Sequence, residues 1–172
     1  FFKDHSLIKK TLNLIDKFLK IHIKNQIDSG AEVIQIFDSW AGLLDEKKID
    51  LLIYKPTEEL VSFTKSLNVP VICFPREIKD YKEYVSNVKP DVVNIDYSVN
   101  PNDIVKNIKI PVQGGLDPKI LLTDKNNIKK NAIKYMEIFR DHPYIFNLGH
   151  GVLPETDPDM VKYLVNVIKE FK

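Results

Sequence analysis

The segment from Tyr144 to Asp159, YIFNLGHGVLPETDPD, contains a short apolar run, a histidine between two glycines and the start of a helix. The apolar run at 145–148 is bounded by turn residues, which predicts a buried strand. Asp157 followed by Pro158 predicts a helix that begins with aspartate as its N-cap. We therefore expect His150 at the end of a strand, where its glycine neighbours free the backbone and let a ligand approach the ring.

The same alternation of helix and strand continues outward from this segment to the start of the chain. β-Branched and aromatic runs predict strands at 31–37, 69–74, 92–96 and 110–114. Helical spacing and capping residues predict helices at 7–27, 57–67, 81–88, 101–108, 124–139 and 158–171. Thr57 is the predicted N-cap of the second helix, and either Thr123 or Asp124 that of the fifth. Strands joined through helices form parallel sheets, so the sequence predicts an α/β fold with about five parallel strands and flanking helices.

The composition is that of a globular domain with one core. The 172 residues are 44% hydrophobic and carry a net charge of +1, which gives no general attraction to nucleic acid or to acidic membranes. No apolar run is long enough to cross a bilayer, and the start, FFKDHSLIKK, lacks the apolar stretch of a signal peptide. Because the chain begins with Phe1, we interpret it as starting inside a longer sequence. The single Cys73 cannot form an internal disulfide, which fits a reducing compartment such as the cytosol.

Polar side chains follow each predicted strand: Asp38, Ser39, Arg76, Asp96, Tyr97, Gln113, Asn147 and His150. In a (β/α) barrel all strand ends open onto one face, whereas a doubly wound sheet gathers ligands only where the strand order reverses. Each residue taken singly could instead be a helix cap or a turn former. Neither of the two commonest glycine-rich nucleotide-binding motifs occurs, which argues against a nucleotide site.

Three motifs carry a resemblance to a known family: QIFDSWAGLL at 35–44, VQGGLDP at 112–118 and FNLGHGVLPETDP at 146–158. In this order and spacing they resemble the C-terminal half of the uroporphyrinogen decarboxylase family. The resemblance implies that residues 1–172 form the C-terminal portion of a single (β/α)8-barrel domain, that is, a partial TIM barrel without its N-terminal strands. It also implies a homodimeric cytoplasmic enzyme that needs no cofactor or metal and removes four acetate carboxylates from uroporphyrinogen III to give coproporphyrinogen III.

The resemblance assigns substrate-binding roles to four residues. Ser39 and His150 match substrate-contacting positions, Phe37 would be a wall of the pocket, and Arg76 would face a substrate carboxylate, for which its planar fork is suited. Gly115 replaces the asparagine of the family motif QGNLDP, and Glu77 stands where glycine is usual. Each of these two departures from the family motif alters one edge of the expected pocket.

The family aspartate that contacts the pyrrole N–H groups has no counterpart here, and neither do the family's N-terminal arginines or its substrate-contacting tyrosine. The catalytic residue therefore remains unknown. A buried anion would stabilise the pyrrole cation that forms before carbon dioxide leaves. We expect the isolated chain to be inactive, and to associate through the open edges of an incomplete barrel.

Two alternatives remain open from the sequence. Methyltransferases of the same superfamily bind zinc through a His-x-Cys motif and a later cysteine, whereas this chain has Val71-Ile72-Cys73 and no second cysteine. The other alternative is a non-catalytic α/β fragment or partner-binding module, in which Cys73 is a core residue and the charges are solvated.

Overall fold

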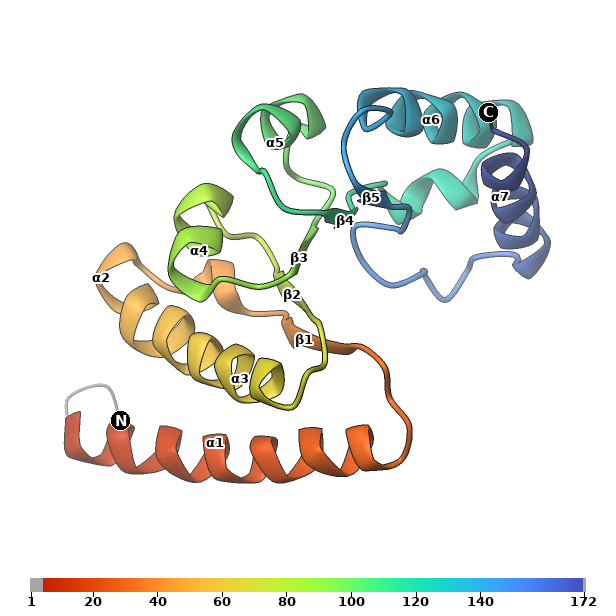
Figure 1. Cartoon of the computed structure of the whole chain (residues 1–172). Helices are drawn as coiled ribbons and strands as arrows, with labels where there is room; N and C mark the ends of the chain where they lie inside the picture. Colours follow the sequence, from red (N-terminus) through yellow and green to blue (C-terminus); the bar gives the residue numbers. More distant parts are fainter. Residues whose placement is uncertain (1–4, 172) are drawn as a thin grey trace.

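The computed structural model describes residues 5–171, which form one parallel sheet with helices along it (Figure 1). The strands are β1 (Ile34–Asp38), β2 (Val71–Pro75), β3 (Val92–Ile95), β4 (Val112–Gly114) and β5 (Tyr144–Ile145). The α-helices are α1 (His5–Asp28), α2 (Glu46–Ile49), α3 (Lys55–Ser66), α4 (Tyr81–Val88), α5 (Pro101–Asn107), α6 (Lys125–Ile138) and α7 (Pro158–Glu170). The α/β fold with five parallel strands is thus confirmed.

The strand order β1-β2-β3-β4-β5 follows the chain without a reversal. A doubly wound sheet would reverse its order, so the topology is that of consecutive strands of a barrel. The sheet is also strongly curved. Gln35 on β1 accepts a hydrogen bond of 3.3 Å from Gln113 on β4, although β2 and β3 lie between them. In a flat sheet these strands would be about 14 Å apart, at three spacings of ~4.8 Å.

The core lies between the outer face of the sheet and the helices. Alternate strand residues point outward and are almost fully buried: Val71, Cys73, Val93, Ile95 and Val112. In Figure 1, α3, α4 and α5 lie along one side of the strands. Tyr84 and Val88 of α4, together with Tyr54 just before α3, complete the same core. Burial of these apolar side chains, at ~25 cal/mol per Å² of area, is what holds the helices onto the sheet.

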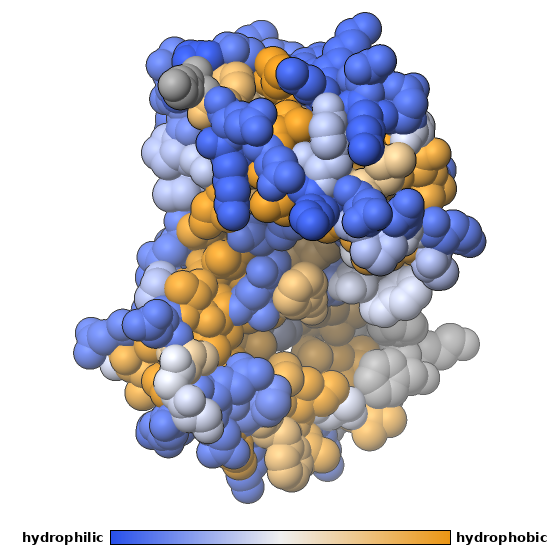
Figure 2. Space-filling model, turned by 90° about the vertical axis from the view of Figure 1, so that its right-hand side faces the viewer, coloured by the Kyte–Doolittle hydropathy of each residue, from blue (hydrophilic) through white to orange (hydrophobic). Residues whose placement is uncertain are grey.

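The inner face of the sheet is only partly covered. Phe37 on β1 is 65% exposed and Ile145 on β5 is 45% exposed. Figure 2 shows a hollow with hydrophobic atoms around it, between the upper part of the molecule, which contains α6 and α7, and the lower part, which contains α1. Parallel sheets are normally covered on both faces, so this inner face lacks the covering that such sheets have.

Two local predictions were wrong. The helix expected from Thr57 begins earlier, because α2 and a π-helical segment (Asp50–Tyr54) run directly into α3. Thr57 is therefore not an N-cap but a buried residue within the helix. Asp45-Glu46-Lys47 reads as a polar loop in the sequence, which concealed this extension.

The strand expected at 145–148 is also shorter and less buried: β5 ends at Ile145, and Leu148 forms a single bridge with Leu116.

Most helix boundaries agree with the predictions. The side chain of Asp157 accepts the backbone N–H of Asp159 at 2.9 Å and caps α7, as the Asp-Pro pair predicted. Asp124 rather than Thr123 caps α6. None of the helices within residues 5–171 combines the length and hydrophobicity that crossing a bilayer requires.

Candidate functional site

A cavity of about 350 Å³ opens on the inner face of the sheet, and we call it the inner cavity. Its lining residues come from three strands and two loops: Gln35, Phe37, Ser39, Phe74, Asn94, Asn147, Leu148, His150 and Gly151. Ser39 and His150 thus lie on one cavity despite their distance in the sequence. This volume is at the lower end of the range for ligand pockets, so the inner cavity suits one ring with its substituents better than a whole tetrapyrrole.

The wall of the inner cavity is aromatic. Phe37 and Phe74 occupy paired positions of β1 and β2, and their rings meet edge to face with centroids 6.0 Å apart. Phe74 is buried, whereas Phe37 is exposed towards the open side. This geometry is favourable for two aromatic rings and leaves a face of Phe37 free to contact a planar ligand.

Ser39 and His150 provide the polar groups at the mouth of the inner cavity. Within residues 5–171 neither side chain makes a hydrogen bond, so both remain available to a ligand. Next to Ser39, burial raises the pKa of the Asp38 carboxyl above its ordinary value, and the N–H of Trp40, which Asp38 accepts at 3.4 Å, offsets part of this rise. Asp38 itself does not line the inner cavity.

The glycines beside His150 serve a purpose other than the one expected. Neither Gly149 nor Gly151 is among the residues with positive φ. A Cβ on Gly149 would lie 2.4 Å from the backbone nitrogen of Tyr97, whereas a Cβ on Gly151 would meet nothing within 4 Å. Gly149 also donates its N–H to the carbonyl of Leu116 at 2.7 Å. The absence of a side chain at Gly149 thus lets two loops touch and positions His150.

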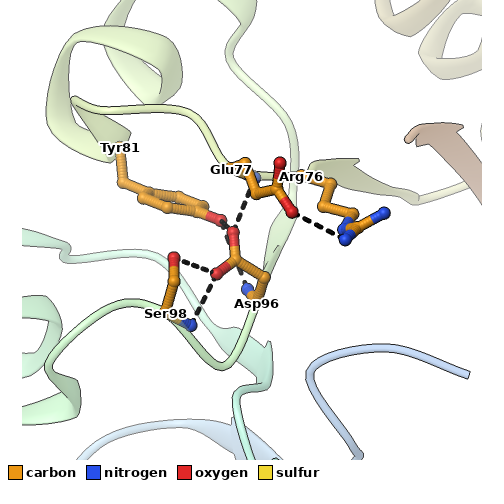
Figure 3. Close-up of polar contacts among 5 residues, drawn as sticks. All are labelled: Arg76, Glu77, Tyr81, Asp96 and Ser98. Carbon is orange, nitrogen blue, oxygen red and sulfur yellow. Dashed lines mark hydrogen bonds and ion pairs between the residues drawn. The ribbon is translucent and has the colours of Figure 1, made fainter. Parts of the chain in front are cut away.

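Arg76 does not line the inner cavity, although it follows the same strand as Phe74. One terminal nitrogen of its guanidinium lies 2.6 Å from a carboxylate oxygen of Glu77 (Figure 3). The Nε atom of Arg76 is buried and has no partner among the described residues. Glu77, at the position where glycine was expected, has a φ of 60° and forms part of the pair. The charge of Arg76 is therefore already neutralised within the chain.

Asp96 forms a buried hydrogen-bond network that joins two loops (Figure 3). Its carboxylate accepts the backbone N–H of Glu77 at 2.7 Å, the hydroxyl of Tyr81 at 3.0 Å, and both the hydroxyl and the N–H of Ser98. Burial, and then the nearby Asp96 carboxylate, raise the pKa of Tyr81 well above its ordinary value, so its hydroxyl stays protonated and donates. Asp96 is 2% exposed and serves the loops rather than the inner cavity.

The lining includes residues that the sequence reasoning missed. Gln35 and Asn94 lie inside strands, whereas the polar candidates had been chosen at the carboxyl ends of the predicted strands and beyond them. The alternation of strand side chains could have identified them, because Gln35 shares a face with Phe37 and Asn94 shares one with Asp96. Polar residues at inward positions of two apolar strands were the available indication.

Cys73 lies on the helix side of β2 and is fully buried. Burial raises the pKa of its thiol to about 12, so it remains protonated at neutral pH. Within residues 5–171 no group of three or more His, Cys, Asp or Glu side chains is arranged to hold a metal ion. The zinc site of the methyltransferase alternative therefore has no counterpart in the described part of the chain.

Comparison with known proteins gives a consistent family match. The family model described as uroporphyrinogen decarboxylase (URO-D) matches residues 1–171. The uroporphyrinogen decarboxylase of Rickettsia bellii is 39% identical over 99% of this chain and 52% of its own length. That of Wolbachia sp. subsp. Drosophila simulans is 38% identical over 96% of this chain and 50% of its own length. The chain thus spans about half the length of these relatives.

A solved structure, thiamine phosphate pyrophosphorylase from Pyrococcus furiosus, aligns with a TM-score of 0.39 at 11% identity, over 87% of this chain and 90% of that one. The fold assignment above rests instead on the strand order and on the curvature that joins Gln35 to Gln113.

Proposed function

Because this chain belongs to the uroporphyrinogen decarboxylase family, we propose that it forms one side of the active site of a uroporphyrinogen decarboxylase. The complete protein that carries the chain would convert uroporphyrinogen III to coproporphyrinogen III by removing four acetate carboxylates. The observation that carries this proposal is the meeting of Ser39, His150 and Phe37 around the inner cavity. The proposal includes a homodimeric, cytoplasmic enzyme, as the resemblance of its motifs implies.

In each turnover the bond between an acetate methylene and its carboxylate breaks, carbon dioxide leaves, and a proton completes the new methyl group. The pyrrole ring, protonated beforehand, accepts the electron pair while this happens, and it gives up the added proton once the methyl group has formed. Phe37 would stack against the ring, and Ser39 and His150 would hold the acetate or deliver a proton at the mouth of the inner cavity. Hydrogen-bond donors held in place before the reaction are effective at this task because they need no reorganisation.

We further propose that the chain is the C-terminal half of a (β/α)8 barrel and is inactive by itself. None of the residues that line the inner cavity carries a carboxylate, so the described residues provide no anion against a pyrrole cation there. The exposed inner face at Phe37 and Ile145 supports a covering by further barrel strands. In the complete protein the missing anion would come from that covering half.

Arg76 has a weaker claim to the substrate than the other three residues. It would have to leave Glu77 before it could bind a substrate carboxylate, because the two side chains are already paired. We retain Arg76 as a proposed carboxylate contact, for which the substrate would have to compete with Glu77. Replacement of Glu77 by Gln would remove this competitor.

The experiment is substitution of Ser39 and His150 by Ala in the complete protein. Turnover is measured as the stepwise conversion of eight-carboxylate to four-carboxylate porphyrinogen. We expect kcat/KM to fall at least about 10-fold for each variant, the effect of losing roughly one hydrogen bond to the transition state. Ser86→Ala and His22→Ala, at exposed helix positions, are the matched controls and should retain activity. Full turnover in folded Ser39 and His150 variants would favour the non-catalytic alternative.

A further inference from the structure

The side chains of Asn94, Gln113 and Gln35 form a hydrogen-bonded amide network across the inner face of the sheet. They come from β3, β4 and β1. Gln113 donates from its amide nitrogen to the oxygen of Asn94 at 2.7 Å and to the oxygen of Gln35 at 3.3 Å. Asn94 and Gln113 are buried, whereas Gln35 is half-buried and lines the inner cavity.

One backbone carbonyl fixes the direction of the whole amide network. The amide nitrogen of Asn94 donates to the carbonyl oxygen of Ile95 at 3.2 Å, and a carbonyl can only accept. The oxygen of Asn94 therefore faces Gln113, which must present its nitrogen. Because that nitrogen also carries a second hydrogen, Gln35 must present its oxygen to Gln113. The nitrogen of Gln35 is left for another partner.

The packing around Asn94 keeps this arrangement in place. A Cβ on Gly114 would lie 2.9 Å from the oxygen and 3.0 Å from the nitrogen of the Asn94 amide. Gly114 also has a φ of 86°, a conformation that favours glycine. The amide of Asn94 thus occupies space that any other residue at position 114 would fill.

The nitrogen of Gln35 has no hydrogen-bond partner within residues 5–171 and is not among the buried unpaired atoms. Gln35 itself lines the inner cavity, so a ligand there is a candidate partner for this nitrogen. Asn147 on the opposite side of the lining also uses its oxygen internally, because it accepts the N–H of Leu148 at 2.8 Å. With Ser39 and His150 added, the polar lining can donate hydrogen bonds from several directions, and it carries no carboxylate.

We propose that Gln35 binds a carboxylate of the ligand in the inner cavity through its amide N–H, and that Gln113 is the positioning residue that turns this N–H towards the ligand. A carboxylate accepts such a hydrogen bond strongly, whereas a donor at the same place would leave both groups unpaired. The identification of the ligand as a porphyrinogen carboxylate rests on the proposed function. The direction of the hydrogen bonds in the amide network does not depend on the proposed function.

The test uses the complete protein with uroporphyrin III, the oxidised and unreactive form of the proposed substrate, as a fluorescent binding probe. Gln35→Met keeps the shape but removes the donor, and we expect the Kd to rise about threefold to tenfold. Gln35→Glu puts an anion against the carboxylate, and the Kd should rise further, by more than about 10-fold. Gln26→Met and Gln26→Glu, on the exposed surface of α1, are the matched controls and should bind as the parent does.

Gln113→Leu tests the positioning role, because Gln35 then loses the donor that holds its oxygen. We expect KM for uroporphyrinogen III to rise with little change in kcat, while a merely structural defect would lower the amount of active enzyme and hence kcat. Thermal unfolding verifies that each variant is folded.

If Gln35→Met and Gln35→Glu bind the probe as tightly as the parent, the carboxylate role of Gln35 is wrong even though turnover persists. A folded parent that binds uroporphyrin III with the expected order of variants, but does not decarboxylate, would contradict the proposed function alone.

Discussion

The carboxylate of Asp96 accepts the backbone N–H of Glu77 at 2.7 Å, so the loop after β3 holds the loop after β2. Glu77 needs this support because its φ of 60° is unfavourable for a residue with a side chain. The hydrogen bond thereby determines where the chain leaves β2 and where Arg76 lies.

Replacement of Asp96 by Asn should destabilise the complete protein by about 2–3 kcal/mol. The amide nitrogen would face one of the N–H or O–H donors that now point at the carboxylate, and a buried unsatisfied donor is costly. Urea denaturation measures the difference. Asp103→Asn, on the exposed side of α5, is the matched control and should change stability by less than about 0.5 kcal/mol. Equal stability of the two variants would contradict the structural role of Asp96.

The two glycines that flank His150 should respond differently to the same substitution. Gly149→Ala would push a methyl group to within 2.4 Å of the Tyr97 backbone, so the loops must separate. We expect a loss of stability of about 1–3 kcal/mol together with weaker substrate binding. Gly151→Ala meets no protein atom within 4 Å and should leave the stability of the protein nearly unchanged. Thermal unfolding measures this difference, and a Gly151→Ala variant as destabilised as Gly149→Ala would show that space does not explain it.

Asp38→Asn should stabilise the protein increasingly as the pH rises. The folded-state pKa of Asp38 is raised by burial, so folding favours its protonated form. The stability associated with that form is present below the unfolded-state pKa and is lost as the pH rises through the folded-state pKa. Asparagine stays neutral and can still accept the Trp40 N–H. The free energy of unfolding, compared at about pH 3 and about pH 7, should differ between variant and parent mainly at the higher pH. A difference independent of pH would refute this.

Cys73 should react with thiol reagents only when the protein unfolds. Its thiol is fully buried, and its pKa of about 12 leaves almost no thiolate at neutral pH. Iodoacetamide labelling followed by mass spectrometry should give little modification of the native protein and complete modification in urea. Rapid labelling under native conditions would place the thiol on an accessible surface and would contradict its burial between β2 and the helices.

The order of helices and strands was predictable because it depends on local patterns. The Asp157-Pro158 pair predicted the start of α7, and the apolar runs located β1 to β4. The position of Ser39 directly after β1 followed from the same patterns, whereas His150 lies in the loop after β5, because that strand ends earlier than predicted, at Ile145. Their meeting at the inner cavity depends on the curvature of the sheet, which no local pattern contains.

The rest of the site depends on contacts between distant residues. The amide network joins Gln35 to Gln113 across two intervening strands, and Gly149 is required by the backbone of Tyr97. Neither contact can be inferred from the sequence that surrounds these residues. The extension of α3 towards Glu46 was missed for another reason, because its charged residues are compatible with either a loop or an exposed helix.

The unreversed strand order also bears on how the protein is made. A ribosome releases the chain from its N-terminus, and every strand from β2 to β5 pairs with the strand released just before it. Each new strand therefore finds its partner already synthesised, and the sheet can grow by one strand at a time. The amide bridge from Gln113 back to Gln35 is made only once β4 has emerged, so the arrangement proposed to bind a carboxylate is completed after the first three strands have paired.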